Sequence, residues 1–203
     1  ASDNGGTHMC FEDVAIIRAI PDSTVIDVTD AAMFKALLKS TLDSDGLIYF
    51  RTGRQNLPDV YPMGTEFQVG KGKVLIDGSD AAVIASGLMV SAALDAAALL
   101  KSENISVRVV DPVTVKPLDK ELVIGCAKET GAIVTAENAN IIGGLGSAVA
   151  ELVCESAPVP VLRVGIEDAF GQTGSVEYLK KEYGLTPEHI AEKVRMALEL
   201  KRR

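Results

Sequence analysis

The fold of this chain is decided by residues 81–112, which read AAVIASGLMVSAALDAAALLKSENISVRVVDP. Within this stretch, an apolar run over 82–86 ends at Gly87, and an alanine-rich segment over 88–100 leads to a second apolar run over 105–110. Short apolar runs are typical of buried strands, and the longer segment between them is typical of a helix. This order predicts parallel strands with a right-handed connection, which is the unit of an α/β fold.

The alternation of strands and helices continues to the end of the chain. The remaining elements are expected as strands over 132–136 and 159–164, and as helices over 119–128, 143–153 and 186–200. Asp119 and Thr186-Pro187 give two of these helices typical start signals. Parallel strands with helices on both faces predict a complete three-layer α/β domain with a mainly parallel sheet over residues 77–203.

Residues 1–62 carry a thinner pattern, which predicts only part of a second α/β domain. Helices are expected over 10–20 and 31–41, and strands over 24–28 and 47–50. Because the chain opens on Ala1 inside a glycine-rich loop, we expect this domain to be truncated at its N-terminus. Residues 63–76 are expected to be a linker that forms a hairpin at Gly70-Lys71-Gly72.

Composition and charge argue against several classes of function. The formal net charge is −8, aromatic residues make up 4% of the chain, and tryptophan is absent. A nucleic acid or an anionic membrane is therefore not expected as a partner, and no apolar run approaches the roughly 20 residues that span a bilayer. Cys10, Cys126 and Cys154 fit neither a metal site nor a disulfide framework, so we expect buried free thiols in a reducing cytoplasm.

Three features of the C-terminal half invite a functional interpretation, but each has a structural explanation that we favour or rank as equal. Gly143-Gly144-Leu145-Gly146 lacks the spacing of a dinucleotide or triphosphate loop, so a tight turn with close helix packing is expected. Glu137 lies at a strand end, where it would either bind a ligand or cap and pack against that turn. His189 is expected on the surface, near the start of the last helix.

Two loops near the start carry the side chains with the clearest chemistry. His8 closes the stretch Asp3-Asn4-Gly5-Gly6-Thr7-His8, and Arg54 lies in Arg51-Thr52-Gly53-Arg54-Gln55-Asn56-Leu57-Pro58. Histidine titrates near neutral pH, and the planar arginine fork suits phosphate. Alone, His8 favours a structural or capping role, and Arg54 would be a surface cation nearly as often as a ligand. A site for a phosphorylated sugar would need both, and the pair supports such a site only in combination with the resemblance that follows.

These residues resemble a known family. Gly6-Thr7-His8, Glu12-Asp13-Val14-Ala15 and Arg54-Gln55-Asn56-Leu57-Pro58 look like the second half of the pyrimidine-binding domain of transketolase. The domain after residue 77 is similar to the transketolase C-terminal domain, through Asp77-Gly78-Ser79-Asp80, Ala85-Ser86-Gly87, Asp111-Pro112, Glu137, Gly143-Gly144-Leu145-Gly146-Ser147 and Phe170-Gly171-Gln172-Thr173-Gly174. The resemblance covers nearly the whole chain.

The resemblance implies an enzyme that transfers a two-carbon ketol unit between ketose and aldose phosphates. Such enzymes use thiamine diphosphate with Mg²⁺ or Ca²⁺, and the cofactor supplies the difficult chemistry. By resemblance, His8 is the catalytic residue beside the cofactor and substrate, and Arg54 binds the substrate phosphate. Asn4 occupies a substrate-binding position that is usually acidic in the family, and Gly6 replaces the usual proline.

The resemblance also implies that parts of the site lie outside this chain. The activating glutamate, the aromatic residues at the pyrimidine and the diphosphate and metal domain would precede it, so no cofactor-binding or metal-binding residue is assigned here. We expect the isolated chain to be inactive. The active enzyme is expected to be a homodimer that also contains the missing N-terminal portion or subunit. The alternatives are another thiamine-dependent enzyme, of the deoxyxylulose-phosphate synthase or 2-oxoacid dehydrogenase β type, and a noncatalytic dimerisation module. A nucleotide-binding domain would depend on the glycine-rich turn alone.

Overall fold

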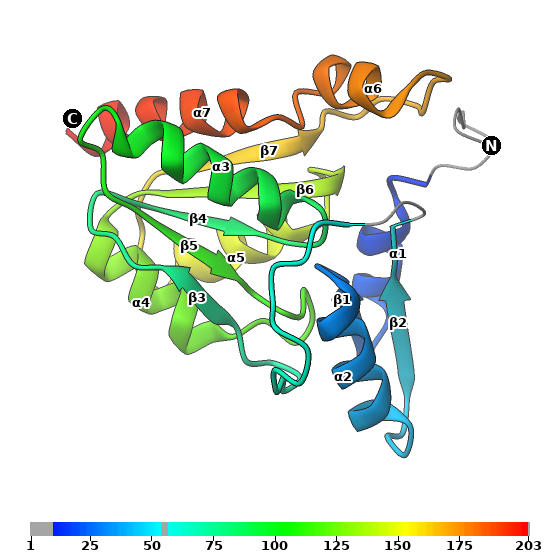
Figure 1. Ribbon diagram of the computed structural model, residues 1–203. Coiled ribbons are helices and arrows are strands. Elements are labelled where there is room, and N and C mark those ends of the chain that lie inside the picture. Colours follow the sequence, from blue (N-terminus) through cyan, green and yellow to red (C-terminus); the bar gives the residue numbers. More distant parts are fainter. Residues whose placement is uncertain (1–9, 54–56, 203) are drawn as a thin grey trace.

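Five strands form the larger of two sheets in the computed structural model, which describes residues 10–53 and 57–202. These are β3 (Lys73–Ile76), β4 (Ala81–Ala85), β5 (Val107–Asp111), β6 (Ile133–Asn140) and β7 (Val161–Ile166). Their order in the sheet is β3-β5-β4-β6-β7, and only the edge strand β3 runs antiparallel to its neighbour (Figure 1). The expected mainly parallel sheet is therefore confirmed.

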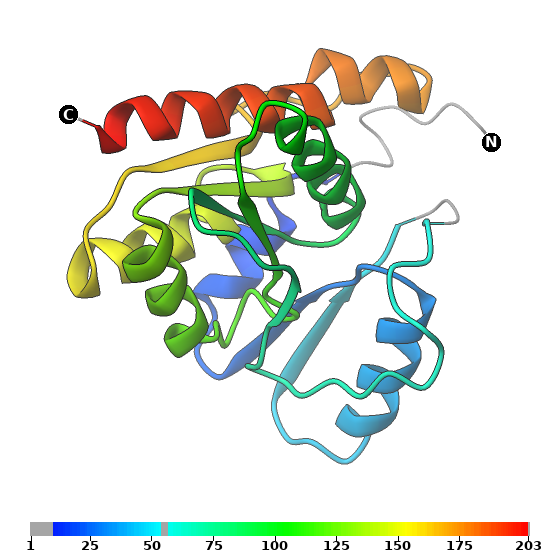
Figure 2. The same cartoon turned by 60° about the vertical axis from the view of Figure 1, so that its left-hand side comes forward.

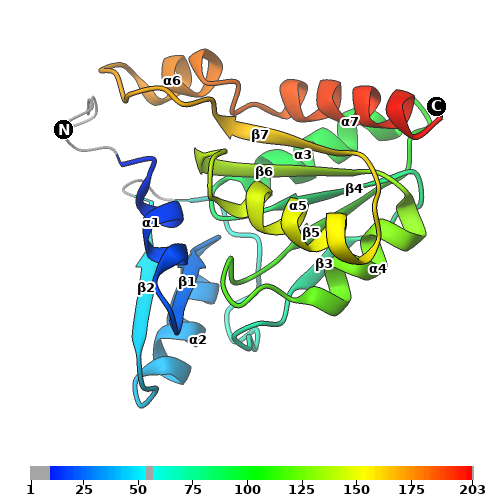
Figure 3. The ribbon, with the colours of Figure 1, turned by 180° about the vertical axis from the view of Figure 1, so that it is seen from behind.

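Helices cover both faces of the five-stranded sheet, as Figures 1 and 3 show. The helices are α3 (Met89–Lys101) and α7 (Pro187–Lys201) on one face, and α4 (Lys120–Thr130) and α5 (Leu145–Ser156) on the other. Successive side chains of a strand point to opposite faces. Accordingly, Val83 packs with the residues of α3 and α7, while its neighbour Ile84 packs with those of α4 and α5. All five residues of β4 are buried, as expected for a central strand of a parallel sheet.

The helix starts expected from the sequence are confirmed by hydrogen bonds. The carboxylate of Asp119 accepts from the Leu122 backbone N–H, and the hydroxyl of Thr186 accepts from that of His189. Helix α6 (Val176–Glu182) was not predicted, because this short helix has no buried residue and thus no apolar stripe. No helix among the described residues has the length and apolar character needed to cross a membrane.

The smaller sheet contains two parallel strands, β1 (Ser23–Asp27) and β2 (Leu47–Arg51). They are connected by α2 (Ala31–Thr41), as the sequence predicts, and preceded by α1 (Asp13–Ala19). Helix α1 is shorter than the expected span of 10–20. The register places Asp27 opposite Arg51, so the two strands end side by side.

The hairpin expected at Gly70-Lys71-Gly72 is not formed. Only β3 is a strand in this region, and it pairs antiparallel with β5 rather than with residues 66–69. The reason is that the glycine amides bond elsewhere: Gly70 N–H donates to the Thr114 hydroxyl at 3.0 Å, and Gly72 N–H donates to the Asp119 carboxylate at 3.1 Å. Residues 57–72 instead run past α2 on their way to β3 (Figure 2).

The three cysteines are free, but they are not all buried as expected. Cys126 lies on the buried side of α4, whereas Cys10 and Cys154 are exposed. Cys154 lies near the end of α5 on its solvent side, and Cys10 precedes the first turn of α1. The expectation therefore holds for one thiol of the three.

Candidate functional site

Asn4, His8 and Arg54, the site residues expected from the sequence, lie outside the described residues. The nearest described neighbours are Cys10, two residues after His8, and Arg51, three residues before Arg54. The site is therefore built from these two flanks and from the side chains around them.

Arg51 is the centre of this region, because its guanidinium contacts three residues from two segments, the entry to α1 and the end of β1. Its Nη2 donates to the Cys10 carbonyl at 3.2 Å, and its Nε donates to Asp13 Oδ2 at 2.9 Å. Its Nη1 lies 3.6 Å from Asp27 Oδ1, at the end of β1. The side chain is only 14% exposed. The chain just after His8 and the chain just before Arg54 thus meet at one cation.

One buried carboxylate, Asp27, and one partly buried carboxylate, Asp13, share this guanidinium. Asp27 Oδ2 also accepts from the Ser86 hydroxyl at 2.8 Å, and Asp13 Oδ2 accepts from the Tyr49 hydroxyl at 2.7 Å. Burial raises the pKa of Asp27, while the charge of Arg51 opposes this rise. Asp13 Oδ1 is buried without a hydrogen-bond partner among the described residues. The cluster is therefore held together by Arg51, since the carboxylates would repel each other without it.

The cluster fills the position at which open α/β sheets usually bind ligands. The connection from β4 to β5 runs to one side of β4, and the next connection crosses back to β6 on the other side, so the crevice lies between the carboxyl ends of β4 and β6. Gly87 follows β4 there, and a Cβ on it would lie 2.5 Å from Asp27 Oδ1. A side chain of the smaller sheet thus occupies the crevice of the larger one.

Glu137 caps α5, which confirms one of the two interpretations of this residue. Its Oε2 accepts from Leu145 N–H and its Oε1 from Gly146 N–H, both at 2.8 Å, and the residue is 1% exposed. Burial raises the pKa of Glu137 to about 7, although the two backbone hydrogen bonds favour its charged form. A helix N-terminus attracts anions, and here the protein's own carboxylate takes that place.

The described residues do not fit a diphosphate or its metal ion. A Cβ on Gly144 would lie 2.0 Å from Glu137 Oε2, so the glycine-rich turn closes on Glu137 and leaves no cradle for a phosphate. Among residues 10–53 and 57–202, no three His, Cys, Asp or Glu side chains are grouped as a metal site would require. The expectation of a tight turn rather than a phosphate loop agrees with this geometry.

A second buried carboxylate also joins the two sheets. Asp111 Oδ2 accepts from the hydroxyls of Thr29, at 2.6 Å, and Tyr61, at 2.9 Å, and its Oδ1 accepts from Val113 N–H at 2.8 Å. Burial raises the pKa of Asp111 to about 6 against these three hydrogen bonds. Asp111 thus holds both the segment after β1 and the segment that leads to β3.

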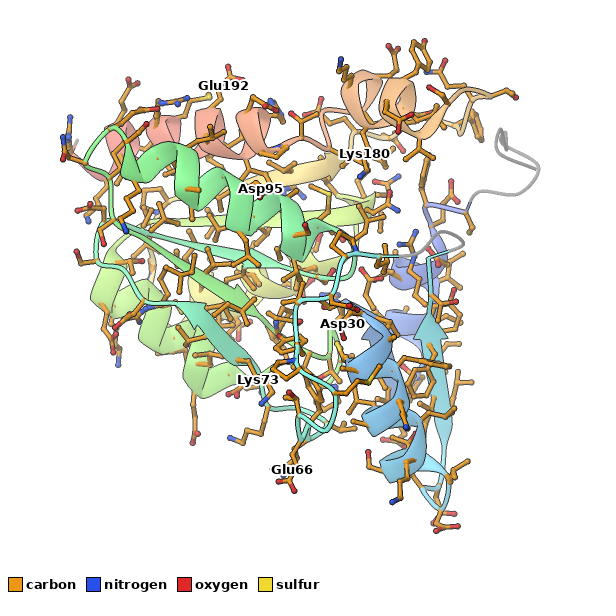
Figure 4. The ribbon with its side chains drawn as sticks, in the orientation of Figure 1. Asp30, Glu66, Lys73, Asp95, Lys180 and Glu192 are labelled. Atoms are coloured by element: carbon orange, nitrogen blue, oxygen red, sulfur yellow. The ribbon has the colours of Figure 1, made fainter. Side chains whose placement is uncertain are left out.

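Asp30 fixes the segment that carries Tyr61. One carboxylate oxygen caps α2 through Met33 N–H, and the other accepts from Val60 N–H at 2.9 Å and Tyr61 N–H at 2.7 Å. Figure 4 shows Asp30 at the start of α2, beside this connection. The backbone is therefore held by Asp30 at Val60, which is six residues after Arg54 in the sequence.

His189 is not part of this cluster, and it is partly buried rather than fully exposed as expected. It is on α7, and its Nδ1 is 3.2 Å from the Glu192 carboxylate of the same helix. Asp27, Arg51 and Ser86 were not predicted as site residues. Each lies at or just beyond the end of an apolar strand, and this position is the signal that points to a shared edge.

Two models of known protein families match the sequence that forms this site. The model described as the transketolase C-terminal domain matches residues 70–190, and the model described as the transketolase pyrimidine-binding domain matches residues 1–60. The chain belongs to the transketolase family. The strand ends that meet at Arg51 and Asp27 therefore lie where the two transketolase regions contact each other.

Transketolase relatives and a solved structure agree over almost all of the chain. The chain is 46% identical to the 6-deoxy-6-sulfo-D-fructose transketolase subunit SqwH of Clostridium sp. (strain MSTE9), over 92% of this chain and 58% of that protein. It is 39% identical to a 1-deoxy-D-xylulose-5-phosphate synthase of Heliobacterium modesticaldum, over 98% of this chain and 31% of that protein. A solved structure titled split gene transketolase, inactive β4 tetramer, has a TM-score of 0.91 and 41% identity, and covers 97% of this chain and 64% of that one. The chain thus spans less than two thirds of these relatives.

Proposed function

We propose that this chain is the C-terminal portion of a transketolase that transfers a two-carbon ketol unit between ketose and aldose phosphates. The single observation that carries the proposal is the Arg51 guanidinium, which holds Cys10 and the end of β2 together. His8 and Arg54 are within three residues of these anchors. In the proposal, a proton-transferring imidazole and a phosphate-binding guanidinium serve the same substrate.

In this proposal the two transketolase regions have different roles. Residues 1–62 are part of a pyrimidine-binding domain, residues 63–76 link it to the next domain, and residues 77–203 are the C-terminal domain. His8 moves protons at the reacting oxygen, Arg54 binds the phosphate, and Asn4 binds a substrate hydroxyl. The family-model matches to both regions support this division.

Thiamine diphosphate and Mg²⁺ or Ca²⁺ belong to the complete enzyme in this proposal. Because the described residues offer neither a phosphate cradle nor a metal site, the remaining parts are supplied by the rest of the polypeptide and by a partner subunit. Subunits named in the split relatives support such a partner. The assembly is proposed to be a homodimer of complete units in the cytoplasm, where it serves sugar-phosphate metabolism.

Replacing Arg54 by alanine tests the proposed function. In the complete enzyme, Arg54→Ala should raise the KM for a phosphorylated aldose about tenfold to hundredfold, because charge-assisted hydrogen bonds to the phosphate are lost. The KM for an unphosphorylated aldose should change little. Arg195→Ala is the matched control, since it removes an arginine that pairs with Glu103 at the surface of α7. An unchanged KM for the phosphorylated sugar would contradict the proposal.

The donor substrate separates transketolase from its relatives. A transketolase uses a ketose phosphate as donor, whereas activity with pyruvate as the only donor would favour a 1-deoxy-D-xylulose-5-phosphate synthase. This synthase is the second candidate, because a relative of that name is 39% identical to the chain. The relative named for a sulfonated fructose supplies a further comparison, a sugar sulfonate in place of the phosphate. The preferred donor is measured by comparing kcat/KM for the three compounds.

The isolated chain is expected to bind no thiamine diphosphate. Calorimetry with the 203-residue chain, cofactor and Mg²⁺ should give no saturable heat, because the turn at Gly144 is closed by Glu137. The complete enzyme serves as the positive control in the same buffer. Stoichiometric, metal-dependent binding to the isolated chain would contradict the proposed division of the site.

A further inference from the structure

We propose that the outer edge of β2 accepts one more strand, which the N-terminal portion of the enzyme supplies and which runs parallel to β2. This inference rests on the proposed function for the existence of that portion, and it adds the place at which the portion docks. The small sheet pairs β2 with β1 alone, and Figures 1 and 3 show β2 on the side that faces away from the larger sheet. This chain covers 58% of the SqwH subunit, so relatives carry further residues that can supply a strand.

Two residues of β2 direct their backbone groups to this outer edge. The Arg51 carbonyl accepts from Val28 N–H at 2.9 Å, so Arg51 directs its backbone groups toward β1. Successive residues of a strand direct these groups to opposite sides, and Ile48 and Phe50 therefore direct theirs outward. No described residue bonds them there. The edge thus offers two N–H donors and two carbonyl acceptors to an incoming strand.

Only the edge of the small sheet is open, because helices cover both of its faces. Ile48 and Phe50 pack with α2, and the ring centre of Phe50 lies 5.6 Å from that of Phe34. On the other face, the Tyr49 hydroxyl donates to Asp13 of α1 at 2.7 Å. Parallel sheets are covered on both faces in this way, but two strands alone are marginally stable. β2 is therefore placed like an inner strand of a larger parallel sheet.

β2 also lacks the features that protect a permanent edge strand. Such strands usually carry exposed charges or a bulge, which prevent pairing with other chains. In the larger sheet, the edge strand β3 has a bulge after Val74, and the other edge strand, β7, exposes Arg163. The one charged residue of β2 is Arg51, which is only 14% exposed and binds Asp13. The outer edge of β2 is thus suited to be paired.

The position of α1 shows on which side the additional strand lies. Connections between parallel strands are right-handed, so chains that cross a sheet in opposite directions place their helices on opposite faces. α2 carries the chain from β1 to β2 on one face, and α1 leads into β1 on the other. A strand that is followed by α1 and β1 therefore lies beyond β2. The far side of β1 is already occupied, since Val25 N–H donates to the Lys116 carbonyl at 2.8 Å.

Hydrogen exchange resolved to single amides tests this inference without an activity assay. In the dilute 203-residue chain, the amides of Ile48 and Phe50 should exchange about a hundredfold faster than those of Tyr49 and Arg51, which face β1. In the complete enzyme, all four amides should exchange slowly. Slow exchange of Ile48 and Phe50 in the isolated chain, or fast exchange in the complete enzyme, would overturn the inference.

Proline and alanine at position 48 form a matched pair of variants. Both remove the apolar side chain, but only Ile48→Pro removes the outward N–H, and neither removes a hydrogen bond to β1. In the complete enzyme, the Phe50 amide should exchange about tenfold faster in Ile48→Pro than in Ile48→Ala. Slow exchange of Tyr49 in each isolated variant shows that the small sheet has formed. Equal exchange of Phe50 in the two complete variants would contradict pairing at this edge.

Failure of the proposed function gives a different result from failure of this inference. If Phe50 is protected only in the complete enzyme while Arg54→Ala keeps a normal KM for the phosphorylated aldose, the strand docks but the proposed reaction is wrong. If Arg54→Ala raises that KM while Ile48 and Phe50 still exchange rapidly in the complete enzyme, the docking of a strand is wrong and the proposed reaction stands.

Discussion

Gly144→Ala should lower the free energy of unfolding by about 3 to 5 kcal/mol. The added methyl group would lie 2.0 Å from Glu137 Oε2 and 2.8 Å from the Asn140 carbonyl oxygen, so the turn or the carboxylate has to move. Overpacking in a buried site costs about 1–3 kcal/mol. Displacing a carboxylate from backbone donors costs about 1.5–3 kcal/mol more.

Gly125→Ala is the matched control for this prediction. Gly125 is inside α4, and the nearest atom to an added Cβ is Glu129 Oε1 at 3.9 Å. Alanine is favoured over glycine in a helix by about 0.5–1 kcal/mol, so this variant should be slightly more stable. Urea unfolding at pH 8 measures both variants. A Gly144→Ala variant as stable as Gly125→Ala would show that the turn adapts to a side chain and that the closure by Glu137 is not rigid.

Asp111→Asn should flatten the pH dependence of stability between pH 4.5 and 7.5. The pKa of Asp111 is raised from 3.8 to about 6, so the folded protein binds more protons than the unfolded chain in this range. Stability from this group is fully present below pH 3.8 and is lost as the pH rises through 6. Over the measured range, this loss is about 2 kcal/mol, and it disappears with asparagine.

Asparagine is a fair replacement because the hydroxyls of Thr29 and Tyr61 can accept hydrogen bonds as well as donate them. Denaturant unfolding at pH 4.5 and 7.5 gives the difference for each variant. Asp95→Asn, which removes an exposed carboxylate of α3 (Figure 4), should keep the wild-type difference. Glu137, with its pKa raised to about 7, adds a loss of the same sign and remains in both variants. A wild-type slope in Asp111→Asn would contradict the assignment.

The sequence predicted the helices and strands better than the contacts between them. Asp119 and Thr186 were recognisable because a helix cap acts within three residues, and the structure shows both of these bonds. Glu137 was narrowed to two interpretations because the glycine-rich turn follows it closely. Hydrogen bonds between residues that are close in the sequence can thus be predicted from one sequence.

The cluster at Arg51 was not predictable in this way. Ser86 and Asp27 are 59 residues apart, and Thr29 and Asp111 are 82 residues apart, so their contacts depend on how the two sheets meet. The sequence showed that these residues follow apolar strands, but not which strand ends face each other. The hairpin prediction was wrong for the same reason. The backbone N–H groups of Gly70 and Gly72 donate to Thr114 and Asp119, which are far from them in the sequence.

The interlocked carboxylates have a consequence for how genes of this kind divide. Asp27 on β1 bonds Ser86 after β4, and Asp111 on β5 bonds Thr29 and Tyr61. A breakpoint between these partners would separate each carboxylate from the hydroxyls that bond it, and would expose to water the apolar side chains that the two parts bury against each other. Gene fission is therefore expected to keep β1 through β5 on one polypeptide.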